Sequence, residues 1–342
     1  MKALQLVEPK NWQVIDVAEP GEPGAGEAVV RVHRVGICGT DYSGYLGKMP
    51  FYSYPRIAGH ELGVEVVAVG AGVTNVAVGD RCSVEPYINC QKCYSCLSGH
   101  TNCCENHQTL GVHCDGGLRR LFTVPARKLH ISRKLNFDQL ALVETLAIGC
   151  HAVDRGAPTS KETVLVIGAG PIGLSVVEFA KLSGARTIVM DMNERRLAFV
   201  RETMGVPDTI LAKGGDEDLR ALEALTGGTL AQVVVDATGS HHSMSGALKY
   251  VGFTGRLVYV GVTQEEVHFG HPLMHRREMS VMASRNAWSR DFSRIINLIE
   301  EGKINTNPWM THSATLEEMP KVFTNWMLPE SGVLKAIVAI DA

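Results

Sequence analysis

The pattern of apolar and polar residues changes once along the chain, near residue 160. Before that point, residues 27–41, 63–73 and 79–87 are short valine-rich runs that partly alternate with polar residues, and glycines separate them. Short alternating runs joined by glycine turns predict β-strands. We therefore expect residues 1–150 to form a β-rich, partly open, barrel-like domain.

After Thr163 the chain alternates between strand and helix patterns. Residues 163–185 predict a buried strand, a glycine turn and a helix, and residues 186–205 repeat this order with a helix that ends at Gly205. A strand at 231–239, a helical stretch that ends with residues 247–255, and a further strand follow. Strands that alternate with helices predict a doubly wound parallel sheet. The expected fold class is therefore α/β.

The C-terminal part contains too few elements for a third domain. Residues 291–303 and 315–326 predict helices, and residues 332–340 predict a final strand. We expect the chain from about 290 to 342 to complete the domain of residues 1–150, and residues 151–289 to form the parallel-sheet domain.

The composition argues against several classes of protein. The chain has 342 residues, 33 of them basic and 36 acidic, with a formal net charge of −3 and no marked basic run, so no nucleic-acid partner is indicated. The N-terminus lacks the apolar segment of a signal peptide, and the most apolar stretch, 164–177, contains glycines and is too short to cross a bilayer. We expect a soluble, cytoplasmic protein with no membrane partner.

Residues 90–104 read CQKCYSCLSGHTNCC and hold five of the nine cysteines. A disulfide scaffold would be shorter and richer in cysteine, and clustered cysteines in a reducing compartment favour metal binding. The spacing C-x2-C-x2-C-x7-C is formed by Cys90, Cys93, Cys96 and Cys104. It begins like a bacterial ferredoxin motif, but its longer last gap favours a closed, four-thiolate zinc site. Cys103 leaves the identity of the fourth ligand open, and reactive cysteines are the alternative interpretation.

A glycine-rich turn, GAGPIG, follows the strand predicted at residues 163–167. Between a strand and a helix, such glycines make a tight turn and let a dinucleotide pyrophosphate approach the backbone. The residues of this turn expected to bind the cofactor are Gly168, Gly170, Pro171, Ile172 and Gly173. Asp191, at the end of the next strand, can accept hydrogen bonds from both ribose hydroxyls of NAD and repels a 2′-phosphate. Arg195 and Arg196 follow closely, so NADP is the alternative.

A second set of potential metal ligands is spread over the first 150 residues. Cys38 lies in GICGTD, His60 and Glu61 lie in GHE, and Glu144 lies in LVETLA. A sulfur, a nitrogen and a carboxylate oxygen can hold zinc and leave one position open for a substrate. Each residue alone has an ordinary structural explanation. Because the motifs occur together and precede a dinucleotide motif, they favour a catalytic metal site.

With GICGTD, GHE, the four-cysteine segment, GAGPIGL and DATG in this order, the chain resembles the zinc-containing medium-chain dehydrogenase/reductase family over essentially its whole length. The resemblance implies a GroES-like catalytic domain and a Rossmann domain. It also implies NAD, two Zn²⁺ ions per chain, a small-molecule alcohol substrate and a homo-oligomer of two or four chains.

The resemblance further implies catalytic zinc on Cys38, His60 and Glu61. Glu144 stands where the polyol-dehydrogenase branch has a glutamate that contacts the metal directly or through water. Thr145 replaces the proline that usually follows, and Cys150 is the competing candidate for a third ligand. We prefer Glu144, with Cys150 in the core.

Catalytic and cofactor roles can be carried over residue by residue. Thr40 occupies the family's proton-relay position. Ser43 stands where many members have a histidine, so the route of the proton after Thr40 is open. The other residues expected to bind the cofactor are Arg196, Gly239, Val260, Gly261, Ser284 and Arg285.

The segments PFYSYPRIAGHE, SGHTNCCE, GVHCDGG and SRNAW are similar to those of sugar-acid oxidoreductases related to L-galactonate and L-gulonate 5-dehydrogenases. This similarity implies oxidation of a secondary alcohol of an aldonate, with Arg285 as a candidate for the carboxylate contact. A surface or subunit-contact role for Arg285 is the alternative.

Other functions remain to be weighed against the oxidation of an aldonate. A polyol is the alternative substrate, followed by threonine or a simple alcohol. A zinc-lobed nucleic-acid-binding or scaffold protein would leave the dispersed ligands and the glycine turn unexplained. The intact ligand sets argue against a zinc-free quinone reductase.

Overall fold

The computed structural model describes residues 1–340, and the chain forms two compact units. Unit 1 contains Met1–Glu144 and the chain from Trp288 onward, and unit 2 contains Thr145–Ala287. The division falls within the helix α3 (Phe137–Gly156). Among the residues described, no helix is both long and apolar enough to span a bilayer.

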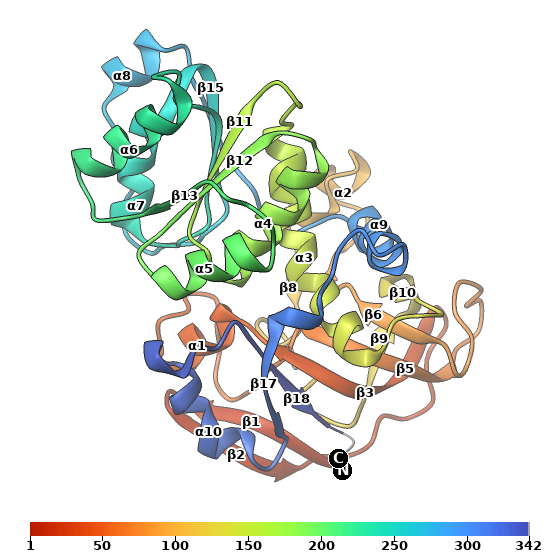
Figure 1. Cartoon of the computed structure of the whole chain (residues 1–342). Helices are drawn as coiled ribbons and strands as arrows, with labels where there is room; N and C mark the ends of the chain where they lie inside the picture. The colour runs from red at the N-terminus through yellow and green to blue at the C-terminus, as the bar shows by residue number, and fades with distance from the viewer. Residues whose placement is uncertain (341–342) are drawn as a thin grey trace. The chain divides into compact units, whose positions relative to one another are not determined.

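Unit 1 is built on a seven-stranded sheet and a three-stranded sheet (Figure 1). Its strands are β1 (Lys2–Glu8), β2 (Asn11–Asp16), β3 (Glu27–Ile37), β4 (Arg56–Ile57), β5 (Glu61–Val69), β6 (Arg81–Val84), β7 (Tyr87–Ile88), β8 (Gln108–Thr109), β9 (Leu121–Pro125), β10 (Leu129–Ile131), β17 (Met310–Thr315) and β18 (Lys335–Ala339). Its helices, besides the first part of α3, are α1 (Gly39–Tyr45), α2 (Tyr94–Leu97), α9 (Ser289–Glu300) and α10 (Met319–Trp326).

The large sheet of unit 1 joins the two ends of the chain. Its strand order is β10-β6-β5-β3-β18-β17, with β9 paired to β3 beside this path. β18 runs antiparallel to β3, with Ala336 opposite Ile37, and it runs parallel to β17. Buried side chains from both segments, including Val30, Leu62 and Phe323, form one apolar core. The C-terminal strands are therefore an integral part of this sheet.

Unit 2 is a six-stranded parallel sheet with the order β13-β12-β11-β14-β15-β16. Its strands are β11 (Thr163–Ile167), β12 (Arg186–Asp191), β13 (Thr209–Leu211), β14 (Ala231–Asp236), β15 (Val251–Tyr259) and β16 (Ser280–Ala283). Its helices are α4 (Pro171–Leu182), α5 (Glu194–Glu202), α6 (Asp216–Thr226), α7 (His241–Gly246) and α8 (His271–Arg276).

Numbered along the chain, the strands of unit 2 lie in the order 3-2-1-4-5-6, which is the Rossmann order. α4 and α5 lie on one face of the sheet, and α6 and α7 lie on the other (Figure 1). The order reverses between β11 and β14. Dinucleotides bind at the carboxyl ends of the strands at such a reversal, so this edge is the expected cofactor site.

Two predictions of secondary structure are wrong. Residues 137–156 form the helix α3 although they fall largely in the region predicted to be β-rich. Apolar residues surround much of this buried helix, so its sequence lacks the one-sided period that indicates a surface helix. Residues 251–255, predicted to end a helix, form the first part of β15, and the strand predicted after them forms the rest. A Cβ on Gly252 would lie 2.6 Å from the carbonyl oxygen of Thr229, so the glycine permits close pairing with β14 rather than ending a helix.

A close approach between α3 and α4 yields a test of the packing in unit 2. A Cβ on Gly149 would lie 2.2 Å from Ser175 Oγ and 2.5 Å from the backbone nitrogen of Val176. We expect Gly149→Ala to lower the free energy of unfolding by about 1–3 kcal/mol because two backbones must separate. Urea unfolding followed by circular dichroism measures the change.

The matched control is Gly246→Ala at the end of α7, where an added Cβ meets no atom within 4 Å. We expect it to be neutral or to stabilise by up to about 1 kcal/mol, because alanine favours a helix over glycine. Equal effects of the two substitutions would contradict the packing argument.

Candidate functional site

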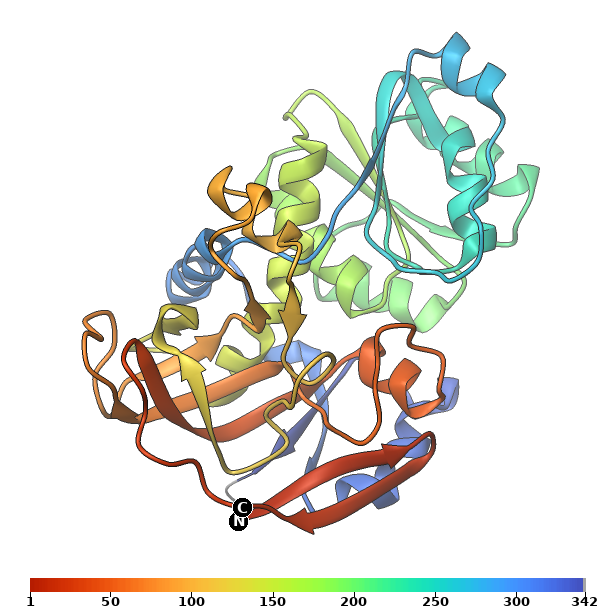
Figure 2. The same cartoon turned by 180° about the vertical axis from the view of Figure 1, so that it is seen from behind.

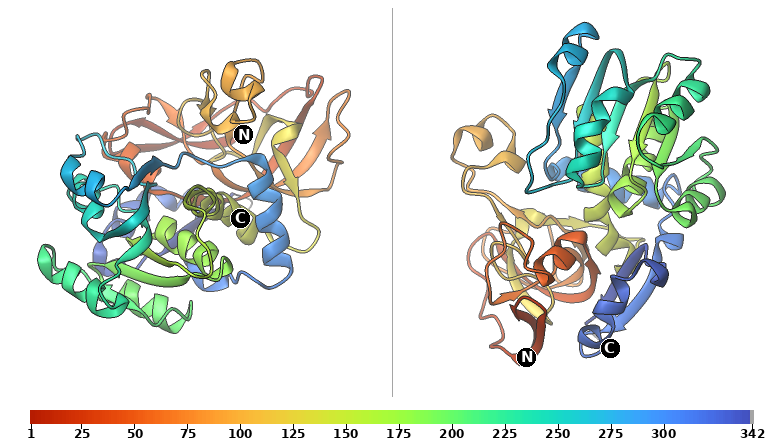
Figure 3. Two further views of the ribbon diagram at one scale, coloured as in Figure 1. Left: turned by 90° about the horizontal axis from the view of Figure 1, so that it is seen from above. Right: turned by 90° about the vertical axis from the view of Figure 1, so that its left-hand side faces the viewer.

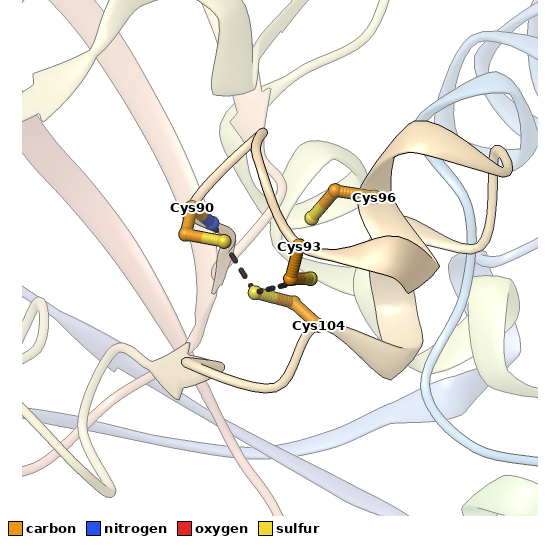
Figure 4. A group of neighbouring side chains, drawn as sticks. All are labelled: Cys90, Cys93, Cys96 and Cys104. Carbon is orange, nitrogen blue, oxygen red and sulfur yellow. Dashed lines mark hydrogen bonds between the residues drawn. The ribbon is translucent and has the colours of Figure 1, made fainter.

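Four cysteines of unit 1 converge in a loop that projects from its strands (Figures 2 and 3). These are Cys90, Cys93, Cys96 and Cys104, and their sulfur atoms all lie within 4.8 Å of one another. Figure 4 shows the four side chains pointing toward a common centre. Cys93 Sγ and Cys104 Sγ are 3.9 Å apart. Four sulfurs at Zn–S distances of about 2.3 Å would be about 3.8 Å apart, so the group fits a tetrahedral zinc site.

The chemistry of the loop also favours a cation. Hydrogen bonds from the backbone amides of Lys92 and Cys93 lower the pKa of the Cys90 thiol to about 6, whereas burial raises the pKa of Cys104 to about 11. Neighbouring thiolates repel one another, so all four can ionise together only if a positive charge lies between them. Cys103 is exposed and is outside this group.

The three dispersed residues predicted to bind a metal also lie together. Cys38 caps α1, and His60 and Glu61 stand at the start of β5. Their ligand atoms all lie within 4.8 Å of one another, and His60 and Glu61 are buried. Nδ1 of His60 and Oδ1 of Asp41 are buried without a hydrogen-bond partner among the described residues. A sulfur, an imidazole and a carboxylate around such orphaned polar atoms fit a metal ion.

Glu61 has a cationic partner that the sequence analysis missed. Lys335, in β18, donates to both carboxylate oxygens of Glu61 at 2.6 and 2.7 Å and to the carbonyl oxygen of Ile37 at 3.2 Å. Burial alone would lower the pKa of Lys335, but Glu61 reverses this effect and the pKa is raised. A single lysine within the apolar run GVLKAIVAI was the available signal.

Glu144 lies in α3 and is buried, but it is not one of the three groups within 4.8 Å. The phenol of Tyr87 donates a hydrogen bond to its Oε1 atom. Burial raises the pKa of Glu144, although the nearby charge of His60 opposes the shift. No sequence motif indicated a role for Tyr87. Cys150, the competing candidate ligand, is a buried residue of unit 2.

The two residues of the predicted proton relay lie on α1, beside Cys38. Thr40 and Ser43 are three positions apart on this helix and are both partly exposed. Residues three apart lie on neighbouring turns of one face. Thr40 and Ser43 therefore lie on the same face of α1, and their role in a proton relay stays a prediction.

The glycine turn of unit 2 has the geometry that a dinucleotide requires. Gly168 has a φ of +98°, and a Cβ on Gly173 would lie 1.7 Å from the carbonyl oxygen of Gly168. Gly170 caps α4, whose first residue is Pro171. A pyrophosphate can therefore approach the backbone at the start of a helix, where unpaired N–H groups favour an anion.

Asp191 borders this turn at the end of β12. Its two carboxylate oxygens accept hydrogen bonds from the backbone nitrogens of Ala169, at 2.6 Å, and Asn193, at 2.7 Å. These bonds fix the carboxylate beside the glycine turn, and each oxygen retains a second lone pair for a ribose hydroxyl. A Cβ on Gly170 would lie 3.8 Å from Nη1 of Arg196, so a guanidinium also reaches the turn.

The remaining residues predicted to bind the cofactor lie just after the strands β14, β15 and β16. A Cβ on Gly261 would lie 2.3 Å from the nitrogen of Gly239, so the turns after β14 and β15 touch through their backbones. Val260, before Gly261, is buried. Ser284 follows β16 and is buried, whereas Arg285 is exposed.

Comparison with known proteins adds family and structural relatives. Residues 24–134 match the alcohol dehydrogenase GroES-like domain, and residues 171–301 match the zinc-binding dehydrogenase domain. The chain is 36% identical over 341 residues to L-galactonate-5-dehydrogenase of Escherichia coli K12, covering 99% of this chain and 98% of the relative. These matches and the solved structures below confirm the predicted GroES-like and Rossmann fold classes.

Two further relatives are 32% identical to the chain. One is L-arabinitol 4-dehydrogenase of Hypocrea jecorina, with 97% of this chain and 92% of the relative covered. The other is 2-dehydro-3-deoxy-L-galactonate 5-dehydrogenase of Pseudoalteromonas atlantica, with 100% and 99% covered.

Two solved structures share the fold over 99% of both chains, each at 29% identity. A short chain alcohol dehydrogenase, rspB, of Escherichia coli CFT073 in complex with NADH gives a TM-score of 0.92. A putative zinc-binding dehydrogenase of Sinorhizobium meliloti 1021 bound to NADP gives a TM-score of 0.90.

The two ligand groups predict different consequences when a cysteine is removed. We expect about two zinc ions per chain in the purified protein by elemental analysis. Cys93→Ser should lower both the zinc content and the melting temperature, because the projecting loop depends on its metal for order. Cys38→Ser should abolish activity and keep the fold. Cys103→Ser, outside both groups, should leave zinc content and stability unchanged, and a fully stable Cys93→Ser protein would refute the structural site.

The carboxylate beside the glycine turn should control the choice of cofactor. We expect Asp191→Ala to weaken NAD binding about 10–100-fold and to reduce discrimination against NADP, because hydrogen bonds to a charged acceptor and a repulsive charge are both lost. Fluorescence titration with NADH and NADPH measures both affinities. Asp208→Ala, which removes the carboxylate paired with Arg186 in the same unit, is the control. An unchanged preference would mean that Arg195 and Arg196 dominate.

Proposed function

Because the chain belongs to the zinc-type alcohol dehydrogenase family, an oxidoreductase family that acts on CH–OH groups, we propose that it oxidises a secondary alcohol of a sugar acid to the ketone with NAD. The observation that carries the proposal is the 36% identity, over nearly the full length, to an L-galactonate-5-dehydrogenase. A second relative of full coverage also acts, by its name, on a galactonate derivative.

We assign the candidate site residues as follows. Cys38 and His60, with a carboxylate from Glu61 or Glu144, hold the catalytic metal, and the four clustered cysteines hold the structural one. When bound, zinc supplies a Lewis acid that favours loss of the alcohol proton, and NAD supplies the hydride acceptor.

Side chains of α1 then carry the proton of the substrate alcohol away. The hydroxyl of Thr40 accepts the proton from the substrate alcohol and donates its own onward. Ser43, on the next turn of α1, or water takes this second proton toward solvent.

NAD is the cofactor that we propose in preference to NADP. The carboxylate of Asp191 is fixed beside the glycine turn by two backbone amides, and a 2′-phosphate placed there would meet its negative charge. Two observations favour NADP instead, namely the NADP-bound structural relative and the guanidinium of Arg196 near Gly170.

A polyol is the second candidate substrate. The similarity to L-arabinitol 4-dehydrogenase, at 32% identity, favours it. The two candidates differ in one respect that can be tested, since a sugar acid carries a carboxylate and a polyol does not. We assign the carboxylate contact to Arg285, an exposed cation that follows β16.

Substrate comparison tests this assignment. We expect wild-type protein to reduce NAD with L-galactonate or L-gulonate at a higher kcat/KM than with L-arabinitol. Arg285→Ala should lower kcat/KM for the aldonate roughly 30-fold or more, because the substrate carboxylate loses its cationic partner. This corresponds to a rise of about 2–5 kcal/mol in the activation free energy. The loss for the neutral polyol should be much smaller.

The control is Arg290→Ala, which removes an exposed arginine that stacks on Trp288 and should affect both substrates little. Equal losses on aldonate and polyol would place Arg285 in a structural or cofactor role. A wild-type preference for the polyol would overturn the sugar-acid proposal and leave the polyol in its place.

A further inference from the structure

Tyr87 is a buried side chain that connects a candidate metal ligand to the packing of unit 1. Its ring centroid lies 6.2 Å from that of Phe292, edge to face, and 6.0 Å from that of His107. Only 2% of its surface is exposed, and its phenol donates to Oε1 of Glu144. The ring contacts fix the direction of the hydroxyl, so the hydroxyl fixes one oxygen of Glu144.

Glu144 lies close to the metal group without being one of its three convergent residues. The charges of His60, Glu61 and Lys335 act on the carboxylate of Glu144. The charge of Cys38 acts on the phenol of Tyr87. Because Oε1 accepts the phenol hydrogen bond, Tyr87 orients Glu144 through one of its two carboxylate oxygens. The two candidate carboxylates thus differ, since Lys335 holds both oxygens of Glu61.

We propose that Tyr87 is a positioning residue for the catalytic metal site, which holds Glu144 through Oε1 and so fixes the orientation in which this carboxylate would face a bound ion. Hydrogen bonds to ligating carboxylates orient them, and loss of such a partner commonly costs 10–100-fold in metal affinity. This role does not depend on which alcohol is the substrate, so it stands or falls separately from the sugar-acid proposal.

Metal affinity, rather than activity, provides the test. Zinc-loaded wild-type and Tyr87→Phe proteins are titrated with a chelator of known affinity, which resolves the weaker catalytic site from the four-cysteine site. We expect Tyr87→Phe to weaken the catalytic site about 10–100-fold and to leave the four-cysteine site unchanged. Cobalt(II) at the catalytic site should show shifted visible absorption bands in the variant.

The control is Tyr250→Phe, which removes another buried phenol near a carboxylate, Asp218, in unit 2. It should leave both metal affinities unchanged. If Tyr87 acts through Glu144, Tyr87→Phe should have less than about a threefold effect in a Glu144→Ala background, because the two effects are then coupled.

A second perturbation keeps the test open if Tyr87→Phe does not fold. Replacement of Tyr87 by 3-fluorotyrosine preserves the ring packing and makes the phenol a stronger donor, so it should shift the cobalt bands of the catalytic site alone. Unchanged affinity together with unchanged cobalt bands would overturn the proposal. A loss of equal size in the wild-type and Glu144→Ala backgrounds would overturn it as well.

Discussion

A buried ion pair between Glu61 and Lys335 underlies the organisation of unit 1. The two residues are 274 positions apart, and both side chains are almost entirely excluded from solvent. Removing one partner of such a pair costs about 3–5 kcal/mol, because the other charge is left buried alone. β18 must therefore lie beside β3 whenever β5 is in place. The same constraint fixes the backbone at His60, which immediately precedes Glu61.

The two candidate carboxylates of the metal site differ in what compensates their charge. Glu61 is neutralised by a lysine, so less negative charge remains to attract a metal ion. Glu144 receives a hydrogen bond from a neutral phenol and keeps its charge when ionised. Burial raises the pKa of Glu144, which means that the ionised form needs a nearby cation. A divalent ion beside Cys38 and His60 would supply that cation.

Local motifs in the sequence identified the groups that are close together along the chain. The four clustered cysteines and the turn between Gly168 and Gly173 could be predicted because their spacing sets their geometry. Lys335 and Tyr87 could not, because each acquires its role from a partner that is distant in the sequence. Helix α3 was missed for a different reason, since a helix buried on most sides carries no one-sided apolar period.

The order of the two units along the chain has a consequence for synthesis on the ribosome. Unit 2 lies wholly between the two segments of unit 1, so β18 emerges long after β3 and β5. At about 5–20 residues per second, the interval between Glu61 and Lys335 is roughly 14–55 s. During that time the end of β3 that pairs with β18 is an open sheet edge, which invites association with other chains. The large sheet of unit 1 can therefore close only after almost the whole chain has been synthesised.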